Sequence, residues 1–201
     1  MEFPVDGDAI IKSIEKIGRV CYKSEDRITQ ESASKFIKAI LRRGHESIIE
    51  HISVSVRLIC DRGVTHEIVR HRIASYSQES TRYCNYADNK FSNELTFIKP
   101  YFFDEGSDAY KLWRDSMEHA EMTYLRLISE GAEPQHARSV LPNSLKTELV
   151  MTMNLREWRH FMRLRTDKAS HPQMREIAFM ILALLKENIP ILFEEFTAPS
   201  I

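Results

Sequence analysis

The sequence is poor in cysteine, and this shortage excludes several kinds of protein. It has three cysteines, Cys21, Cys60 and Cys84, and no CxxC pair. An odd number of widely spaced cysteines argues against a disulfide framework and against a structural zinc site. We therefore expect reduced thiols and a cytoplasmic protein.

Glycine is also scarce. The six glycines form neither a GxGxxG motif nor a P-loop. Nucleotide sites of those two kinds cradle phosphates with glycine-rich backbone. A phosphate bound by this chain would therefore have to be held by side chains.

Long apolar runs are missing as well. The longest, IAFMILALL at 177–185, is shorter than the roughly 20 residues that a helix needs to span a bilayer. The N-terminal stretch MEFPVDGDAI has no basic start followed by an apolar run, so it predicts no signal peptide. We expect no membrane partner.

The charges nearly cancel. The formal net charge is -1, so bulk charge gives no support for nucleic-acid binding, and any basic character must be local. The 43% hydrophobic and 28% charged residues are typical of a soluble globular protein. The 201 residues suffice for one domain, which we expect to cover 1–201.

Helical periodicity dominates the chain. Apolar residues recur at a spacing of three or four, Gly44 stands where a C-terminal cap belongs, and Asn154 and Glu157 have capping-box spacing. These patterns predict helices over 8–22, 33–41, from 62, 107–130, 134–141, 154–165 and 172–185.

Strand signals are fewer. In HISVSVRLIC, apolar and mostly polar residues alternate from Ile52 to Cys60, which predicts a strand with one buried face. A second strand is predicted over 145–153, with weaker signals near 82–86 and 95–99. The fold class predicted is α+β, a helix-rich single domain packed on a small mixed or antiparallel sheet.

The stretch RHRIASYSQESTRY, from Arg70 to Tyr83, concentrates hydrogen-bonding groups. It holds three arginines, a histidine and several hydroxyl residues, which a core cannot bury without partners. Arginine presents a planar fork of donors that matches phosphate oxygens. An anion site is therefore indicated. The alternative is that its arginines are solvated ion-pair partners of Glu67, Glu79 and Asp61, contacts worth about 0–1 kcal/mol each.

A second polar cluster is NLREWRHFMRLRTDKASH. On a helix, Arg156 and His160 share one face, and Trp158, Phe161 and Arg165 share another. The two aromatic residues are expected to pack in the core. A guanidinium at the edge of that core needs an acceptor, which makes Arg165 a candidate site residue.

Zinc chemistry is not supported by the histidine spacing. A zinc-protease helix places two histidines four apart on one face. Here His66 and His71 are five apart, and His45 and His51 are six apart. Neither pair fits.

RHRIASYSQESTRY resembles the signature of flavin-dependent thymidylate synthases, in which RHR is followed by spaced serines and an SxR. The matching positions are Arg70, His71, Arg72, Ser75, Ser80, Arg82 and Tyr83. GHESIIEH (44–51) resembles the family's GHxSxxEH segment, and ARSVLP (137–142) its short helix with a nucleotide-binding arginine. NLREWRHFMRLR (154–165) resembles its C-terminal flavin and substrate segment.

The resemblance implies an enzyme that methylates dUMP reductively to dTMP. The carbon would come from 5,10-methylenetetrahydrofolate, with release of tetrahydrofolate, and the electrons from NADPH through FAD. Family members are homotetramers whose active sites take residues from more than one subunit. The implied partners are therefore dUMP, folate and further copies of the same chain, with no nucleic acid.

Site residues follow from the resemblance position by position. The FAD contacts it implies are Ser47, Arg70, His71, Arg72, Gln78, Asn154, Arg156 and His160. The dUMP contacts it implies are Glu67, Arg70, Gln78, Glu79, Ser80, Thr81, Arg82, Arg138 and Arg165. Ser80 and Arg82 would lie near the phosphate. Arg165 is the candidate catalytic residue, because a cation beside the pyrimidine would stabilise the negative charge that builds as hydride arrives.

The chain departs from the family pattern at several positions. Glu67 stands where some members have Gln, Gln78 where others have Glu, and His160 where relatives have an amide. A longer loop precedes His171, which is left unassigned. The other thymidylate synthase class uses a cysteine nucleophile, but here only Cys84 lies beside the motif, and we expect it to be structural.

Two other classes of function stay open from the sequence. One is a nucleic-acid-binding module that uses the same arginines on phosphates. The other is a flavoprotein or regulator that binds ligands without methylating them. A purified yellow protein would argue against the first class, and dTMP formation would argue against the second.

Overall fold

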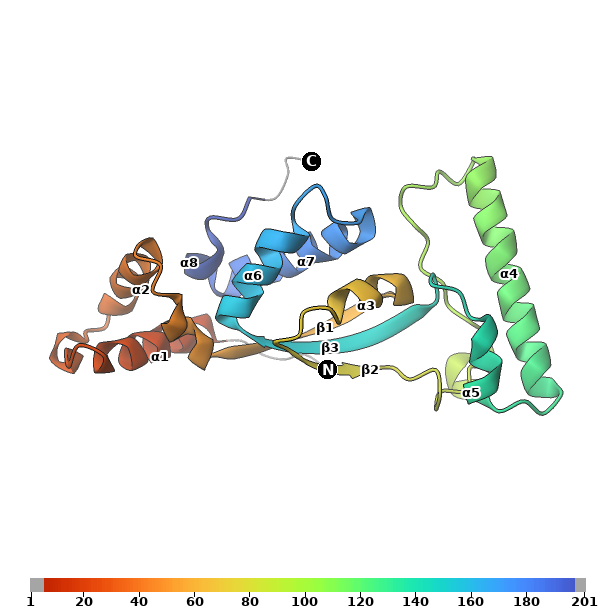
Figure 1. The fold of residues 1–201 in the computed structure, drawn as a ribbon, viewed down its shortest axis with the longest axis horizontal. Helices are drawn as coiled ribbons and strands as arrows, with labels where there is room; N and C mark the ends of the chain where they lie inside the picture. The colour runs from red at the N-terminus through yellow and green to blue at the C-terminus, as the bar shows by residue number, and fades with distance from the viewer. Residues whose placement is uncertain (1–5, 198–201) are drawn as a thin grey trace. The chain divides into compact units, whose positions relative to one another are not determined.

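The computed structural model describes residues 6–197, which divide into two compact units (Figure 1). The first unit comprises the described residues up to Val56, His71–Ser75, and those from Met151 on; the second comprises Arg57–Arg70 and Tyr76–Val150. Residues 1–5, where the stretch searched for a signal peptide begins, lie outside the described residues.

The first unit is mostly helical and also holds parts of strands described below. Its helices are α1 (Gly7–Val20), η1 (Glu25–Arg27), α2 (Ser32–Arg42), η2 (Glu46–His51), α6 (Leu155–Arg165), α7 (Pro172–Asn188) and α8 (Pro190–Phe193). Helix α1 packs on α2, and α6 packs on both η2 and α7. Ile14, Ile37, Trp158 and Phe161 are completely buried in this unit.

Local capping chemistry sets several helix ends. The Asp6 side chain accepts a hydrogen bond of 3.0 Å from the Ala9 amide and starts α1. Asn154 accepts one of 2.9 Å from the Glu157 amide and starts α6, which confirms the predicted cap. Gly44 follows α2 with a φ of 70°, the left-handed conformation that favours glycine at a helix C-terminus.

The second unit carries the long helix α4 (Asp108–Ser129). Its other helical elements are α3 (Arg62–Ile68), η3 (Asn89–Phe91), α5 (Pro134–Ala137) and η4 (Arg138–Val140). Helix α4 packs against α5 and η4. The core of this unit joins Tyr86, Leu95, Tyr124, Ala137 and Leu145.

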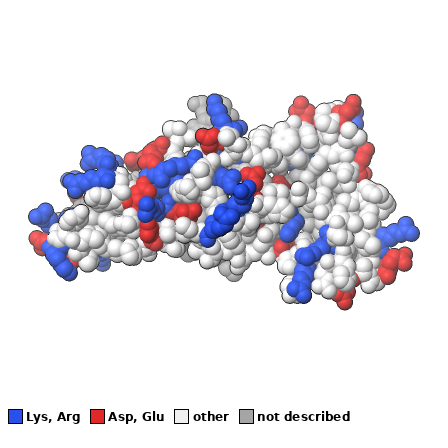
Figure 2. All heavy atoms as spheres, viewed as in Figure 1, with Lys and Arg blue, Asp and Glu red and all other residues white. Residues whose placement is uncertain are grey.

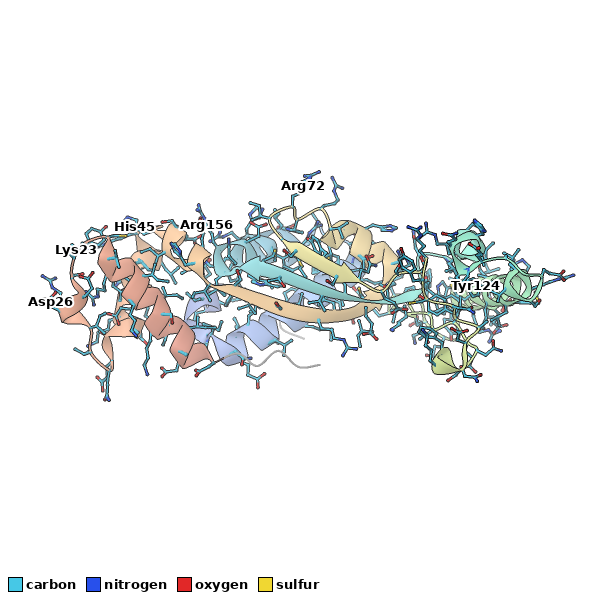
Figure 3. The ribbon with its side chains drawn as sticks, turned by 90° about the horizontal axis from the view of Figure 1, so that it is seen from below. Lys23, Asp26, His45, Arg72, Tyr124 and Arg156 are labelled. Atoms are coloured by element: carbon cyan, nitrogen blue, oxygen red, sulfur yellow. The ribbon has the colours of Figure 1, made fainter. Side chains whose placement is uncertain are left out.

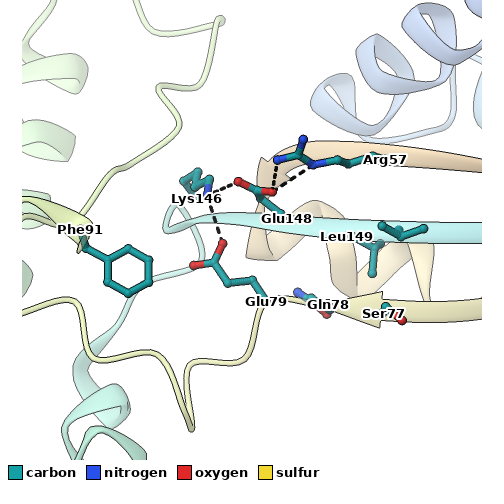
Figure 4. A pocket seen from close by; sticks show the side chains of 9 residues that line it. Arg57, Ser77, Gln78, Glu79, Phe91, Lys146, Glu148 and Leu149 are labelled. Atoms are coloured by element: carbon teal, nitrogen blue, oxygen red, sulfur yellow. Dashed lines mark hydrogen bonds and ion pairs between the residues drawn. The ribbon is translucent and has the colours of Figure 1, made fainter. Parts of the chain in front are cut away.

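Three strands form one sheet in the order β1 (Ser53–Asp61), β3 (Lys146–Asn154), β2 (Ser75–Gln78). Ser55 pairs with Thr152, and farther along β1 Arg57 pairs with Glu148, so β1 and β3 run antiparallel. Figure 4 shows β2 and β3 also running in opposite directions. Side chains of β3 alternate strictly between buried and half-buried positions.

The predicted helix-rich α+β class with a small antiparallel sheet is confirmed. The strand predicted near 82–86 is wrong, because the Tyr83 and Cys84 amides both bond to the Ser80 carbonyl and make turns instead. The signal at 95–99 corresponds to a single bridge, Phe97 to Leu145.

The sequence pattern did not predict β2 or α8. Strand β2 contains no aliphatic residue, so it lacks the alternation by which a half-buried strand is recognised.

The described surface mixes both signs of charge. On the face in Figure 2, Lys and Arg side chains lie beside Asp and Glu side chains. Within residues 6–197, no helix is both long and apolar enough to cross a membrane.

Candidate functional site

The predicted site residues fall into two groups, one in each unit. The first unit holds Ser47, His71, Arg72, Asn154, Arg156, His160 and Arg165. The second holds Glu67, Arg70, Gln78, Glu79, Ser80, Thr81, Arg82 and Arg138.

His71 and Arg165 form the central contact of the first group. Arg165 Nε donates a hydrogen bond of 2.9 Å to His71 Nε2. His71 is only 5% exposed, and its ring lies 4.8 Å from that of Phe161. Burial, together with the charges of Arg165 and His160, lowers the pKa of His71 to about 4. The imidazole is therefore neutral at pH 7, with its proton on Nδ1 and its lone pair turned to Arg165.

A carboxyl group lies on the other side of the same imidazole. Glu157 Oε1 is 3.7 Å from His71 Nδ1, and burial raises the pKa of Glu157. Sequence reasoning used Glu157 only as a capping residue and missed this position. The available signal was its spacing of four from Phe161, which places both on one helix face.

A cavity of about 400 Å³ opens beside the start of α6. Its lining consists of Glu46, Glu50, Ile73, Asn154, Arg156, Glu157, His160 and Arg163. The lining thus includes Asn154, Arg156 and His160, three of the residues expected to contact FAD, whereas Ser47 is exposed and not part of it. Arg156 donates to the Glu50 carboxylate.

The exposed Arg72 precedes Ile73 in the chain, and its side chain projects outward from its loop (Figure 3). It therefore stands next to a residue that lines the cavity.

A buried arginine fixes the GHESIIEH segment to α6. Arg159 is 2% exposed and donates to Glu46 at 3.1 Å, to Glu195 at 2.8 Å and to the Leu192 carbonyl. Burial would raise the pKa of Glu46, but the hydrogen bond from Arg163 and the charge of Arg159 lower it overall. Sequence reasoning missed this network.

In the second group, Gln78 is held by hydroxyl groups. Its amide nitrogen donates to Thr65 Oγ1 at 3.1 Å and to Thr147 Oγ1 at 3.4 Å. These two bonds fix the orientation of the Gln78 amide.

Glu67, another predicted ligand of this group, lies on α3 and is half-buried.

Glu79 belongs to a set of charged groups at a cavity of about 460 Å³ (Figure 4). Its carboxylate accepts from the Tyr86 hydroxyl at 2.7 Å and from Lys146 Nζ at 3.0 Å. Lys146 also donates to Glu148 at 2.9 Å, and Glu148 accepts from Arg57. The sequence did not predict the two direct partners of Glu79, Tyr86 and Lys146. It also did not predict Glu148 and Arg57, which are connected to Glu79 through Lys146.

The segment that follows Glu79 forms a compact turn. Ser80 Oγ accepts from the Arg82 amide at 3.3 Å, and Thr81 is 5% exposed. Arg82 Nε donates to Gln135 Oε1 at 3.2 Å. Gln135 lies on α5, and Arg138 begins η4 directly after it, so Arg82 is bonded to the helix that precedes Arg138.

Several arginines have no acidic partner. Within the described residues, no carboxylate oxygen lies within 4.0 Å of the exposed side chains of Arg70, Arg72 and Arg138. The alternative reading, in which the arginines of the motif pair with Glu67, Glu79 and Asp61, therefore does not describe Arg70 or Arg72. Among the described residues, Arg62 Nη1 is buried without a hydrogen-bond partner, which is unusual for a buried donor.

The described residues contain no cluster of three or more His, Cys, Asp or Glu side chains able to hold a metal ion. Across both groups, the available chemistry is guanidinium, amide, hydroxyl and imidazole, with carboxyl groups such as Glu67 and Glu157 beside them. This set suits anions and polar rings.

Comparison with known proteins identifies the family. The family model described as "Thymidylate synthase complementing protein" matches residues 8–191. The flavin-dependent thymidylate synthase of Pyrococcus furiosus is 37% identical over 161 residues, which cover 80% of this chain and 65% of that protein. The protein of the same name from Thermococcus onnurineus is 34% identical over 81% of this chain and 66% of its own length.

A third relative is covered more fully. The flavin-dependent thymidylate synthase of Corynebacterium aurimucosum is 32% identical over 91% of this chain and 78% of its own length. The chain thus spans just under two thirds of the archaeal relatives and more of the corynebacterial one. On the extent of these matches, the chain belongs to the family of thymidylate synthase complementing proteins.

Proposed function

We propose that this chain is a flavin-dependent thymidylate synthase, which methylates dUMP to dTMP with 5,10-methylenetetrahydrofolate as carbon donor and NADPH as reductant through FAD. Family membership and the names of the relatives support this assignment. The observation that carries it is the set of exposed arginines without acidic partners, Arg70, Arg72 and Arg138, at positions matched by the motifs. Anionic ligands such as FAD and dUMP would supply the missing charge.

The residues of the first unit fit a bound FAD. The cavity beside α6 offers donors and acceptors from Asn154, Arg156 and His160 for the polar parts of the cofactor, and Arg72 has charge available for phosphate. The proposed FAD contacts are Ser47, Arg70, His71, Arg72, Gln78, Asn154, Arg156 and His160. Once reduced by NADPH, a bound FAD would supply a hydride to the pyrimidine that carries the transferred carbon unit.

The proposed dUMP contacts are Glu67, Arg70, Gln78, Glu79, Ser80, Thr81, Arg82, Arg138 and Arg165. In this set Ser80 and Arg82 serve the phosphate. The side chains of Glu79 and Thr81 are engaged or buried within the chain, so they would act through the shape of their segment.

Arg165 is the proposed catalytic residue. Its bond to the neutral His71 fixes one edge of the guanidinium. A planar cation held in this way would stabilise negative charge on the pyrimidine without reorganising. No thiol is required. Burial, with the charge of Asp61, raises the pKa of Cys60 to about 12, so this thiol stays protonated.

The assembly belongs to the same proposal. The chain would act as one functional domain in a cytoplasmic homotetramer whose active sites are shared between subunits. The support is the resemblance of the motifs.

One experiment tests the assignment. The purified protein should show flavin absorbance, sediment as four chains, and form dTMP in an anaerobic single turnover with dUMP, methylenetetrahydrofolate and NADPH. A colourless protein with salt-sensitive RNA binding would indicate a nucleic-acid-binding module. A yellow protein that forms no dTMP would indicate a flavoprotein without methylating activity.

The role of Arg82 predicts a phosphate-specific effect. Arg82→Ala should weaken dUMP binding by about 10- to 100-fold, since hydrogen bonds to charged groups contribute roughly 1.5–3 kcal/mol. Binding isotherms with dUMP and with deoxyuridine measure this directly. Deoxyuridine, which lacks the phosphate, should bind poorly and equally to both forms.

Arg114→Ala is the matched control for Arg82, because Arg114 is an exposed arginine of α4 whose partners are Asp115 and Glu118. It should leave dUMP binding unchanged. Equal dUMP affinity for wild type and Arg82→Ala would contradict the phosphate assignment.

A further inference from the structure

The segment after β2 leaves the sheet and returns to the core within a few residues. The Glu79 amide makes the last bond to β3, donating to the Glu148 carbonyl at 2.8 Å. Residues 80–85 then follow as a loop with a turn at 81–83, and the buried Tyr86 rejoins the core, 5% exposed. This loop, residues 80–85, carries Ser80 and Arg82.

A single side-chain hydrogen bond joins the two ends of the loop. The Tyr86 hydroxyl donates to Glu79 Oε1 at 2.7 Å. The Tyr86 ring is held in the core, edge-on to the Tyr124 ring with the two centroids 5.9 Å apart. The backbone amide of Tyr86 also donates to the Tyr124 hydroxyl at 3.3 Å. The anchored end of the loop therefore fixes the end that leaves the sheet.

Lys146 attaches the same carboxylate to the sheet. It donates to Glu79 Oε2 at 3.0 Å and to Glu148 Oε1 at 2.9 Å (Figure 4). The side chains of Glu79 and Lys146 are 12% and 24% exposed. Such partly buried pairs are screened less by solvent than surface pairs.

Protonation states suit these contacts at neutral pH. Burial alone would lower the pKa of Lys146, but its hydrogen bonds to Glu148 and Glu79 raise it overall, so it is cationic. Burial, and then the bond to Glu79, raises the pKa of the Tyr86 hydroxyl, so it remains a donor.

The two faces of the strand separate these contacts from the side chain of Gln78. Gln78 points to Thr65 and Thr147, whereas the next side chain, Glu79, points to Lys146. Neighbouring side chains of an extended segment point to opposite faces. Glu79 therefore lies on the face away from Gln78.

We propose that Tyr86, Glu79 and Lys146 form a clasp that holds the 80–85 loop in the shape needed to bind the nucleotide phosphate. The side chains of these three residues position Ser80 and Arg82 and do not touch the nucleotide; the dUMP contact proposed for Glu79 is left to its backbone. The proposal rests on the function proposed above. A loop ordered in advance loses less conformational entropy on binding, so the clasp raises affinity.

Tyr86→Phe is the sharpest test, because it removes only the hydroxyl and keeps the ring in the core. Affinity for dUMP should fall about tenfold, as expected for losing one charge-assisted hydrogen bond. Turnover at saturating dUMP and affinity for deoxyuridine should stay near wild type. Tyr110→Phe, on a ring stacked on Trp113 in α4, is the matched control and should change none of these values.

A second pair of variants separates charge from packing. Lys146→Met should weaken dUMP binding in the same way, and Lys146→Arg should restore most of it. The double variant with Tyr86→Phe should lose less than the sum of the single losses, because both act through Glu79. Unchanged dUMP affinity in a folded Tyr86→Phe protein would overturn the clasp, as would lost turnover with affinity retained.

The outcome separates this inference from the proposed function. If wild type does not bind dUMP, the function is wrong. The clasp is then judged by hydrogen exchange alone. The Tyr83 and Cys84 amides, both bonded to the Ser80 carbonyl, should exchange faster in Tyr86→Phe than in wild type. Equal exchange rates would reject the clasp without reference to any ligand.

Discussion

Arg165→Ala is expected to lower the rate of dTMP formation by about 100-fold or more, the size of effect seen when one transition-state donor is removed. Its Nε is fixed by His71, so the rest of the guanidinium is oriented before substrate arrives. Such a group acts mainly in the transition state, so turnover should fall more than dUMP affinity. Single-turnover kinetics and equilibrium binding measure the two quantities separately.

Arg165→Lys should also be impaired, although it keeps the charge. An ammonium group cannot bond His71 and present a planar fork to the substrate at the same time. Lys168→Ala, at an exposed cation just beyond the end of α6, is the control and should be fully active.

A protein with all three cysteines changed to alanine tests whether the same mechanism needs a thiol. It should still form dTMP, with some loss of packing at Cys60. If that protein folds and binds FAD and dUMP but makes no dTMP, the mechanism without a thiol is wrong.

Trp158→Ala should lower the free energy of unfolding by about 3–5 kcal/mol, the usual range for deleting a buried aromatic side chain. Trp158 is fully buried, and its indole nitrogen donates to the Val54 carbonyl at 3.0 Å. Its ring also lies 5.5 Å from Phe161, which contacts His71. Urea unfolding followed by circular dichroism measures the loss.

Trp113→Ala provides the comparison, because Trp113 is half-buried and bonds the Ser144 hydroxyl at 3.0 Å. It should lose less stability than Trp158→Ala. Equal losses would mean that burial of Trp158 contributes less than its position in the core implies.

Most of the fold could be predicted because local patterns specify it. The long amphipathic helix α4, the alternating strand β1 and the Asn154 cap are each encoded within a few neighbouring residues. Strand β2 is different, since its Gln78 is held by Thr65 and Thr147, which are 13 and 69 residues away. No local periodicity reports contacts of that kind.

The candidate site divides along the same line. The arginines and serines of the site could be predicted from the motif, because a motif is recognised by the order of its residues in the chain. Their supports were not predicted. Glu79 meets Lys146 from 67 residues away, and Arg159 meets Glu46 from 113 residues away. From sequence alone, a charged residue on a strand or helix is assigned to the solvent-exposed face, because its distant partner is not known.

The arginines without acidic partners also affect the stability and turnover of the protein itself. Arg70, Arg72 and Arg138 carry charge that no carboxylate of the described chain offsets. Folding and ligand occupancy are therefore linked, since an anion that binds only the folded form adds about 2.7 kcal/mol to its stability at 100 times its dissociation constant. On the proposed function, nucleotide supply would then set the half-life of the protein as well as its rate of catalysis, because a chain without ligand unfolds and is degraded more readily than one with ligand bound.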